Sequence, residues 1–458
     1  MPRFDAPWAA VAALMTASSP AAAATVRPEP ASNRWQEDWS ALADPTLRTE
    51  PFDRLKYISL QGGAYLSFGA TVRERIEFAD GAEFGTRAPY DSYLLQRVQA
   101  HADVHWSDRW RAFVQVEDVR TFGKQRPTPT DRNPVDLRLA FVGYRRQIRH
   151  GTWMTRIGRQ DFAFGQQRFL SLRDGPNVRQ SFDGLWVRYE TGAWEISGLV
   201  SQPVRYRADE HFDDLSKGDQ RFGMLRAERK TRRGTASVFY ARLRNDSTSF
   251  LDAAGREWRD NLDVHVTGTQ GAWDWDAEGI AQSGAVGHAS VRAWAAGLRG
   301  GYTFQAQAWT PRLGLQLDAA SGDERPGDAR LNTFNPLFPN GSYSFTLAGH
   351  TGYVNVIQVK PSLKLRPTAS IEVSAAVAGL WRENVHDAVY VQPDLPLAGS
   401  AAARDRYTAS YVQLHAQWNP TPQFTTVVEL VHYDVGRVVR DAGGRDSDYA
   451  GLELKFSW

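Results

Sequence analysis

Arginine is the main cationic residue of this chain, and it recurs at every second position in several segments. The sequence holds 54 Lys and Arg residues, of which only seven are Lys. A guanidinium group stays charged at any physiological pH and pairs with a carboxylate through two parallel hydrogen bonds. Six arginines fall on the polar face of the first five predicted strands: Arg73, Arg75, Arg97, Arg111, Arg138 and Arg156. Such a row could pass carboxylates from one cation to the next, because conduction needs weak and repeated contacts.

Carboxylates occupy the same polar face, so a purely structural interpretation stays open. The acids expected there are Asp103, Glu117, Asp136, Glu195, Asp263, Asp274, Asp276, Glu278, Asp318, Glu372, Glu429 and Glu453. Later strands add the cations Arg299, Arg312, Lys360, Lys364, Arg366, Arg382 and Lys455. Cross-strand ion pairs between these groups would stiffen a sheet. A basic first wall and a more acidic middle of the chain favour a path for anions, and both interpretations remain.

The other residue types that could do chemistry form no recognisable site. The spacing of Asp274, Asp276 and Glu278 could gather a hard cation, but a patch of ion pairs fits this basic surrounding better. No Cys is present, and His101, His105, His265 and His415 alternate onto the polar face. No nucleophile or nucleotide motif stands out, so we predict no enzyme, no cofactor, no metal and no nucleic-acid partner. A barrel lipase or protease is the enzyme alternative.

The polar face exists because polar and apolar residues alternate over long stretches. From Tyr65 onward, segments of roughly 10 to 16 residues follow a period of two, as in strands whose faces meet different environments. In the final segment Leu452, Leu454 and Phe456 share one face, while Glu453 and Lys455 share the other. Eight short turns and nine longer connections rich in Gly, Asp and Pro predict eighteen strands. The last of them, Tyr449–Trp458, should pair with the first near Leu66–Arg75 and close the sheet.

Composition decides which architecture these strands build. Charged residues make up 23% of the chain and aromatic residues 12%, with sixteen Trp. No apolar run after the N-terminus reaches the ~18 residues of a spanning helix. A β-sandwich or propeller is the soluble alternative, but no blade repeat is visible. We therefore predict an all-β fold, an 18-stranded antiparallel transmembrane β-barrel of the bacterial outer membrane with short periplasmic turns and long extracellular loops.

The N-terminal part divides differently from the rest. Residues 1–24 resemble a secretory signal peptide, with an apolar stretch and an A-x-A site at Ala22 and Ala24. Residues 25–56 are rich in Trp, acids and Pro, and we expect a periplasmic segment that tucks into or beneath the barrel. Residues 57–458 form the predicted barrel.

Arg159, Asp161 and Asp183 conflict with the alternation, because it places them on the apolar face. A charge at the bilayer midplane costs about 2–4 kcal/mol. Either they lie at the outer rim or a β-bulge turns them inward, and we expect the bulge. The connection 322–349 is long enough to fold over the mouth of the barrel. It could form an ordered lid or be a disordered loop, and both alternatives remain.

Four stretches resemble the alginate-export family of outer-membrane porins. They are 33–58, which begins Asn33-Arg34-Trp35, then Leu66–Gly69 with Arg73-Glu74-Arg75, Ile157–Gln160 with Phe164, Gly165 and Arg168, and Ser181–Gly184. The resemblance implies a monomeric eighteen-strand channel with a constricted, Arg-rich lumen. The known exporter carries a long periplasmic turn as a plug before its penultimate strand. Here that connection, Asn419–Pro422, is short, which puts alginate itself in question.

The expected function is passive diffusion of an anionic polysaccharide, an alginate-like polyuronate, out of the cell. The alternative is a general or substrate-specific porin for the uptake of small solutes. Expected partners are the anionic polysaccharide or small anionic solute, outer-membrane lipid, the barrel-assembly machinery and periplasmic secretion proteins. The expected solute path lists Arg73, Arg75, Arg97, Arg111, Arg138, Arg156, Arg159, Asp183, Glu429 and Lys455.

Overall fold

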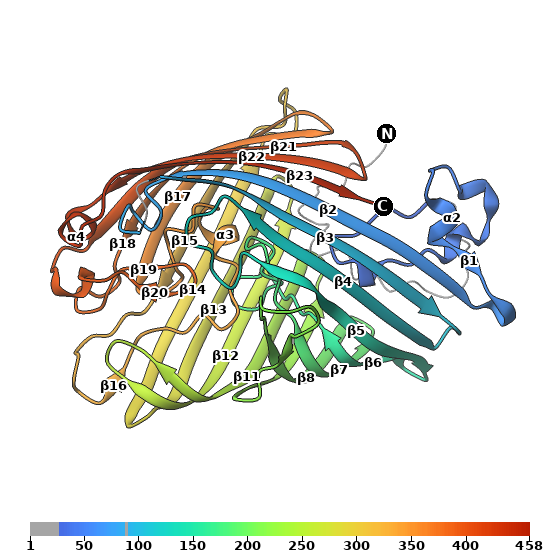
Figure 1. Cartoon of the computed structure of the whole chain (residues 1–458), viewed down its shortest axis with the longest axis horizontal. Helices are drawn as coiled ribbons and strands as arrows, with labels where there is room; N and C mark the ends of the chain where they lie inside the picture. The colour runs from blue at the N-terminus through green and yellow to red at the C-terminus, as the bar shows by residue number, and fades with distance from the viewer. Residues whose placement is uncertain (1–26, 88–89) are drawn as a thin grey trace.

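One closed antiparallel sheet dominates the computed structural model, which describes residues 27–87 and 90–458 (Figure 1). Eighteen long strands of the described residues form its wall, as the alternation predicts. The first nine are β2 (Tyr65–Asp80), β3 (Asp91–His105), β4 (Trp110–Phe122), β5 (Asn133–Ile148), β6 (Gly151–Gln160), β7 (Phe182–Thr191), β8 (Trp194–Arg205), β10 (Gln220–Lys230) and β11 (Gly234–Ser249). The others are β12 (Ala254–Gln270), β13 (Trp273–Val286), β14 (Ala289–Thr303), β15 (Arg312–Ala320), β17 (Val356–Thr368), β18 (Ile371–Trp381), β21 (Tyr407–Thr421), β22 (Phe424–Val435) and β23 (Ser447–Ser457).

The barrel closes where the last strand meets the first. In β2, Thr71–Asp80 pair with Ser457–Asp448 of β23. The expected partner is correct, and the register lies further along β2 than the expected Leu66–Arg75. Closure leaves no free sheet edge, so every strand of the wall can satisfy its main-chain groups within the sheet.

Short and long connections alternate and gather at opposite ends. The short ones are 106–109, 149–150, 192–193, 231–233, 271–272, 304–311, 369–370 and 422–423. We call this the short-turn end and the opposite one the long-loop end; α2 marks the first and α4 the second in Figure 1. Outer-membrane barrels keep short turns in the periplasm.

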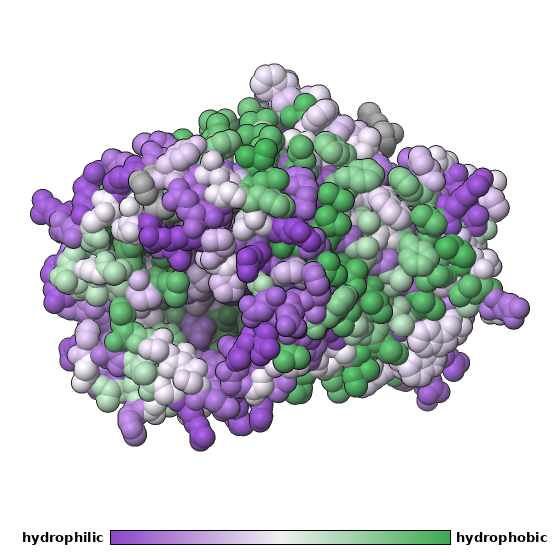
Figure 2. All heavy atoms as spheres, viewed as in Figure 1, coloured by the Kyte–Doolittle hydropathy of each residue, from purple (hydrophilic) through white to green (hydrophobic). Residues whose placement is uncertain are grey.

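The outer face of the wall is apolar. Leu262 and Val264 on β12 are more than half exposed, and Trp106 and Trp110 stack at the short-turn end with ring centroids 6.4 Å apart. In Figure 2 apolar side chains form a band over the strands, and hydrophilic ones gather over the connections at the left. No helix within the described residues is long and apolar enough to cross a membrane.

Long connections fold back into the barrel and build its core. Phe169 and Leu170, between β6 and β7, pack with Phe338 and Tyr353, which lie between β15 and β17. These connections carry short elements: β9 (Leu215–Ser216), β16 (Arg330–Leu331), α3 (Gly341–Ser344), β19 (Tyr390–Val391), β20 (Leu395–Pro396), η5 (Ser400–Ala402) and α4 (Arg437–Asp441). Of the segment 322–349, residues 331–349 are mostly buried in the interior, whereas residues 324–330 are exposed, and β16 lies beside β14.

The segment before β2 lies at the short-turn end. It contains η1 (Arg34–Gln36), η2 (Ser40–Ala43), η3 (Pro45–Leu47), α2 (Asp53–Lys56), β1 (Ile58–Ser59) and η4 (Gln61–Gly63). β1 pairs with the start of β2, and Phe52 stacks on Trp458 with ring centroids 4.8 Å apart. The expected signal peptide, 1–24, lies outside the described residues.

Candidate functional site

All six arginines of the first wall point into the barrel. They share the inner face with Tyr65, Gln99 and Phe113, while their strand neighbours, such as Val72 and Val114, face outward. Five of the six are at most 7% exposed, because protein fills the lumen around them, and Arg111 keeps 21% of its side chain exposed. The position of five of them follows directly from the period of two, whereas Arg138 is the unpaired residue of a β-bulge opposite Gln115 and Val116.

Two of these arginines, together with Arg179, surround Asp174, which lies between β6 and β7. Arg97 Nη2 lies 2.5 Å from Asp174 Oδ1, and Arg73 Nη1 donates to the main-chain oxygen of Asp174 at 2.8 Å. Arg179 Nε lies 3.5 Å from the same Oδ1. Desolvation would raise the pKa of Asp174, but the charges of Arg97, Arg179 and Arg73 hold it well below its usual range. Asn177 fills the rest of the site by accepting from Arg73 Nη2 at 2.8 Å.

The remaining four arginines have other partners in the wall or the lumen. Arg75 Nε lies 2.5 Å from Glu77 Oε1, and Arg111 donates to both carboxylate oxygens of Asp103. Arg138 Nη2 donates to Asp161 at 2.9 Å. The guanidinium carbon of Arg156 lies between Trp35 and Trp186, 4.0 and 4.4 Å from their ring centroids. For Arg75, Arg111 and Arg138 the ion-pair interpretation therefore applies.

An acidic wall faces the basic one across the lumen. Arg168 Nη1 lies 2.5 Å from Glu278 on β13, and its Nε lies 3.4 Å from Asp318 on β15. Asp276 is 3.5 Å from Arg168 Nη2 and 2.5 Å from His265. Asp274 binds Arg312 through both oxygens. The acids Asp274, Asp276 and Glu278 are thus members of ion pairs.

Residues 161–181, which we call the crossbar, connect the two walls. This segment leaves the sheet at the end of β6 and returns at β7. Its Arg168 lies against the acidic wall, and its Asp174 lies against the basic wall. The sequence suggests a basic and an acidic wall, and the crossbar between them places a cation on the acidic wall and an anion on the basic wall.

Glu429 and Lys455 also face inward. Glu429 Oε1 accepts from the main-chain N–H of Leu347 at 2.7 Å and so holds the connection between β15 and β17. Lys455 is half-buried and lies opposite Arg73 in the β2–β23 ladder.

Arg159 and Asp183 correct the sequence-based expectation, because they face outward. The register of β6 is continuous with β5 and with β7, so no bulge turns these residues into the lumen. They form a bidentate pair at 2.9 and 3.1 Å. Ser216 of β9 donates to Asp183, and Asp214 accepts from Arg159 through its main-chain oxygen, so the connection between β8 and β10 covers the pair. Asp161, just beyond β6, turns inward.

The N-terminal segment reaches the crossbar from the short-turn end. Trp35 Nε1 donates to Asp161 at 2.7 Å, and Asn33 accepts from Arg179 at 2.8 Å. Lys56 lies 3.9 Å from Glu37, and burial lowers its pKa to about 7 although Glu37 opposes the shift. The segment thus lies beneath and partly within the barrel.

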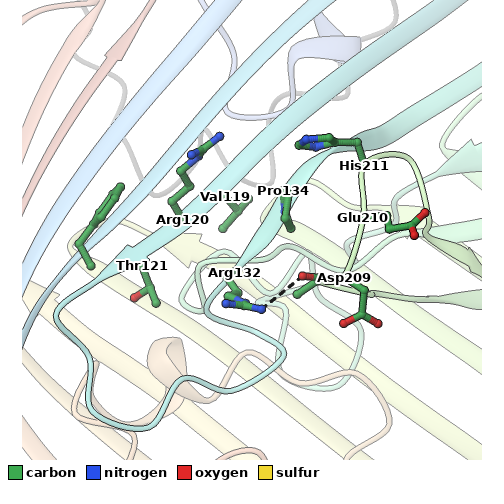
Figure 3. Close-up of a pocket in the computed structure, with 10 residues that line it drawn as sticks. Val119, Arg120, Thr121, Arg132, Pro134, Asp209, Glu210 and His211 are labelled. Carbon is green, nitrogen blue, oxygen red and sulfur yellow. Dashed lines mark hydrogen bonds between the residues drawn. The ribbon is translucent and has the colours of Figure 1, made fainter.

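Two features near the long-loop end lie apart from this path. Carboxylate oxygens of Asp136, Asp213 and Asp214 come within 4.8 Å of one another and could hold a cation, and burial raises the pKa of Asp214 to about 6. A cavity of about 890 Å³ lies between the ends of β4 and β5 and residues 208–211 (Figure 3). There Arg132 donates to the main-chain oxygen of Ala208 at 3.3 Å.

Sequence reasoning missed the crossbar contacts. Arg168 belongs to a visible motif, and 164–179 is a visible long connection. Asp174, Asn177 and Arg179 carry no local pattern. Arg73 and Arg97, the partners of Asp174 and Asn177, lie about 80 to 100 residues away in the chain. Only the length and polarity of the connection could have signalled an inner loop.

Comparisons with known proteins identify the family. The model of the alginate export family matches residues 64–453. No curated protein matches the sequence. Solved structures similar to the fold include Pseudomonas aeruginosa OccK9 (OpdG), with 14% identity, a TM-score of 0.56 and coverage of 86% of this chain and 98% of that one.

Two further structures of Pseudomonas aeruginosa proteins show the same architecture. OccK2 (OpdF), solved in complex with glucuronate, has 12% identity and a TM-score of 0.55. The match covers 86% of this chain and 97% of the OccK2 chain. OccD3 (OpdP) has 11% identity and a TM-score of 0.56, with 88% and 93% covered. With its closed barrel of eighteen strands, its charged interior and the family match across most of its length, the chain belongs to the alginate export family and is a channel of the bacterial outer membrane.

Proposed function

We propose that this channel passes carboxylate-bearing sugars by passive diffusion, and in particular polyuronate chains of the alginate type. The observation that carries the proposal is the convergence of Arg97 and Arg179 on the carboxylate of Asp174 inside the barrel, with Arg73 on the main-chain oxygen of the same residue. A uronate residue presents the same group to the lumen. The family description and the glucuronate bound to OccK2 support the same class of solute.

The chemistry of guanidinium suits transport of this kind. Each arginine can form two parallel hydrogen bonds with a carboxylate and remains charged throughout. Several such cations along a wall let a polymer exchange one contact for the next, whereas one tight site would trap it. Arg75, Lys455 and Arg111 extend the basic wall along β2, β23 and β4.

Uptake of small uronates is the second candidate, and the filled lumen favours it. The crossbar and the connection between β15 and β17 occupy the interior, which leaves five of the six arginines of the first wall almost fully buried. A narrow path suits a monosaccharide better than a polymer. In both cases we propose a monomer without a catalytic step, metal, cofactor or nucleic-acid partner. Its partners would be outer-membrane lipid, the barrel-assembly machinery and periplasmic secretion proteins.

A series of oligouronates in planar bilayers separates the two candidates. We expect anion selectivity in a KCl gradient and current block by guluronate or mannuronate oligomers. Block that strengthens with oligomer length supports the polymer path, and block that is complete with the monosaccharide supports uptake. Neutral maltooligosaccharides of equal length are the control. Cation selectivity together with indifference to uronates would refute both forms of the proposal.

A further inference from the structure

The part of the crossbar that touches the basic wall is accessible to water. Asp174 keeps 31% of its side chain exposed, and Arg173 beside it is half-buried. The cations around Asp174 are almost fully enclosed, with Arg73 only 1% exposed. The carboxylate therefore sits at the border between the solvent in the lumen and a buried cluster of cations.

The two ends of the crossbar are held with different firmness. Arg168 is fully buried among Asp276, Glu278 and Asp318, and Phe169 and Leu170 next to it belong to the main hydrophobic cluster. Asp174 instead makes its two ion pairs through a single oxygen, Oδ1, on the exposed side of the segment. Displacing Asp174 breaks two ion pairs, whereas displacing Arg168 would expose three buried acids and an apolar core.

The cluster on the basic wall has capacity for another carboxylate. Among the described residues, Asp174 is the one acid that lies within 3.5 Å of Arg97 and Arg179. Glu453, 3.8 Å from Arg73, is shared with Arg75, and Asp161, 4.0 Å from Arg179, is shared with Arg138. Nε of Arg73 and Nε of Arg97 are buried and have no hydrogen-bond acceptor among the described residues. An incoming carboxylate could use these donors once the loop carboxylate has moved away.

We propose that Asp174 is a tethered occupant of the carboxylate site formed by Arg73, Arg97 and Arg179, and that a carboxylate of the passing solute opens the lumen by displacing it. This inference rests on the proposed function, and it adds the regulation of the same site. A tethered competitor has a high effective concentration, so it closes the site without a tight contact of its own. The fixed Arg168 end would let the segment return after the solute has passed.

Asp174→Asn is the direct test, because it keeps the shape of the side chain and removes its charge. We expect a higher open probability, a shift of the reversal potential towards chloride, and about a tenfold lower half-blocking concentration of digalacturonate. Such a factor corresponds to a free site populated about one tenth of the time in the parent channel. Asp209→Asn, another loop acid, which lines the outer cavity, is the matched control and should behave like the parent.

A cysteine variant tests the charge independently. The chain has no Cys, so Asp174→Cys carries a single thiol. Modification with a sulfonatoethyl methanethiosulfonate adds an anion and should close the open variant again. The aminoethyl reagent adds a cation of similar size and should leave it open. Equal effects of both reagents would mean that bulk, not charge, closes the lumen, and the proposal would be wrong.

Arg97→Gln separates this inference from the proposed function. Suppose that Arg97→Gln abolishes block by digalacturonate, while the folded Asp174→Asn channel has the same half-blocking concentration as the parent. The channel then binds uronates, but Asp174 does not compete with them. If neither substitution changes the block, the carboxylate site itself is refuted. The shift of the folded band in unheated gel samples verifies that each variant forms a barrel.

Discussion

Arg159 and Asp183 show how a single ion pair can stabilise the wall without serving the path. Both lie on the outward face of β6 and β7, and the connection that contains Asp214 and Ser216 covers them. Arg159→Ala leaves the carboxylate of Asp183 without its cation, so we expect a loss of about 1–3 kcal/mol in the free energy of unfolding. Urea titration of the protein in detergent measures it.

Ion selectivity supplies the other half of this test. Because Arg159 does not face the lumen, the reversal potential of Arg159→Ala should equal that of the parent, whereas Arg97→Ala should shift it towards cations. A shift of similar size in both variants would place Arg159 on the solute path after all.

Lys56 makes the attachment of the N-terminal segment depend on pH. Its pKa in the folded protein is about 7, below the ordinary 10.5, because burial disfavours the charged form. Between these values the detached segment binds more protons, so the attached state gains stability as the pH rises from 7 to 10. Below pH 7 the attached segment carries the full free-energy cost of burying the charged ammonium group of Lys56. The pKa of Glu37 is raised by burial, which gives the opposite slope in the acid range.

A dye on Ala41→Cys reports this attachment. We expect its signal to move towards the attached state between pH 7 and 10, and to stay flat there in a Lys56→Met background. An equal pH slope in both proteins would assign the effect to another group.

At the scale of elements, the crossbar depends on a glycine in the opposite wall. A Cβ added at Gly297 on β14 would lie 2.3 Å from Nε of Arg168, so Gly297→Ala must displace the guanidinium from its acids. Breaking a buried ion pair costs about 3–5 kcal/mol, which sets the upper bound for the loss of stability. We expect larger and noisier single-channel currents.

Gly143→Ala is the matched control for this change. Gly143 also lies on the inner face, on β5, but an added Cβ there would meet its nearest neighbours at 3.9 Å. Its currents and its unfolding free energy should match those of the parent. Quiet, parental currents in Gly297→Ala would show that the Arg168 contacts do not hold the crossbar in place.

At the scale of the whole molecule, the bilayer is the solvent of the outer face. Val264 on β12 and Phe212 in the connection between β8 and β10 are both more than half exposed, yet only the first lies within a spanning strand. Val264→Arg should cost about 2–4 kcal/mol of folding free energy in liposomes. Phe212→Arg should change it by no more than about 0.5 kcal/mol. Equal costs in the two variants would contradict the placement of the bilayer around β12.

The wall could be predicted from the sequence because its rule is local. A period of two decides which side chains face inward, so Arg73, Arg97 and Arg156 were expected in the lumen and lie there. Alternation also placed Arg159 and Asp183 outside, and the structure agrees with it; the error lay in the bulge that we invoked to bring them inside. The register of the closing pair was shifted, because β23 meets β2 across almost the whole length of the chain.

The sequence by itself determined that this chain is an eighteen-strand barrel with a basic early wall and a more acidic later one. Only the tertiary structure decided what occupies its interior. Alternation is a property of neighbouring residues, whereas Asp174 meets Arg73 and Arg168 meets Glu278 across about 100 residues of chain. Contacts of that separation depend on how closure of the barrel brings distant strands around the loops. The row of arginines can therefore be predicted from the sequence, whereas the contact between these arginines and Asp174 is visible only in the folded protein.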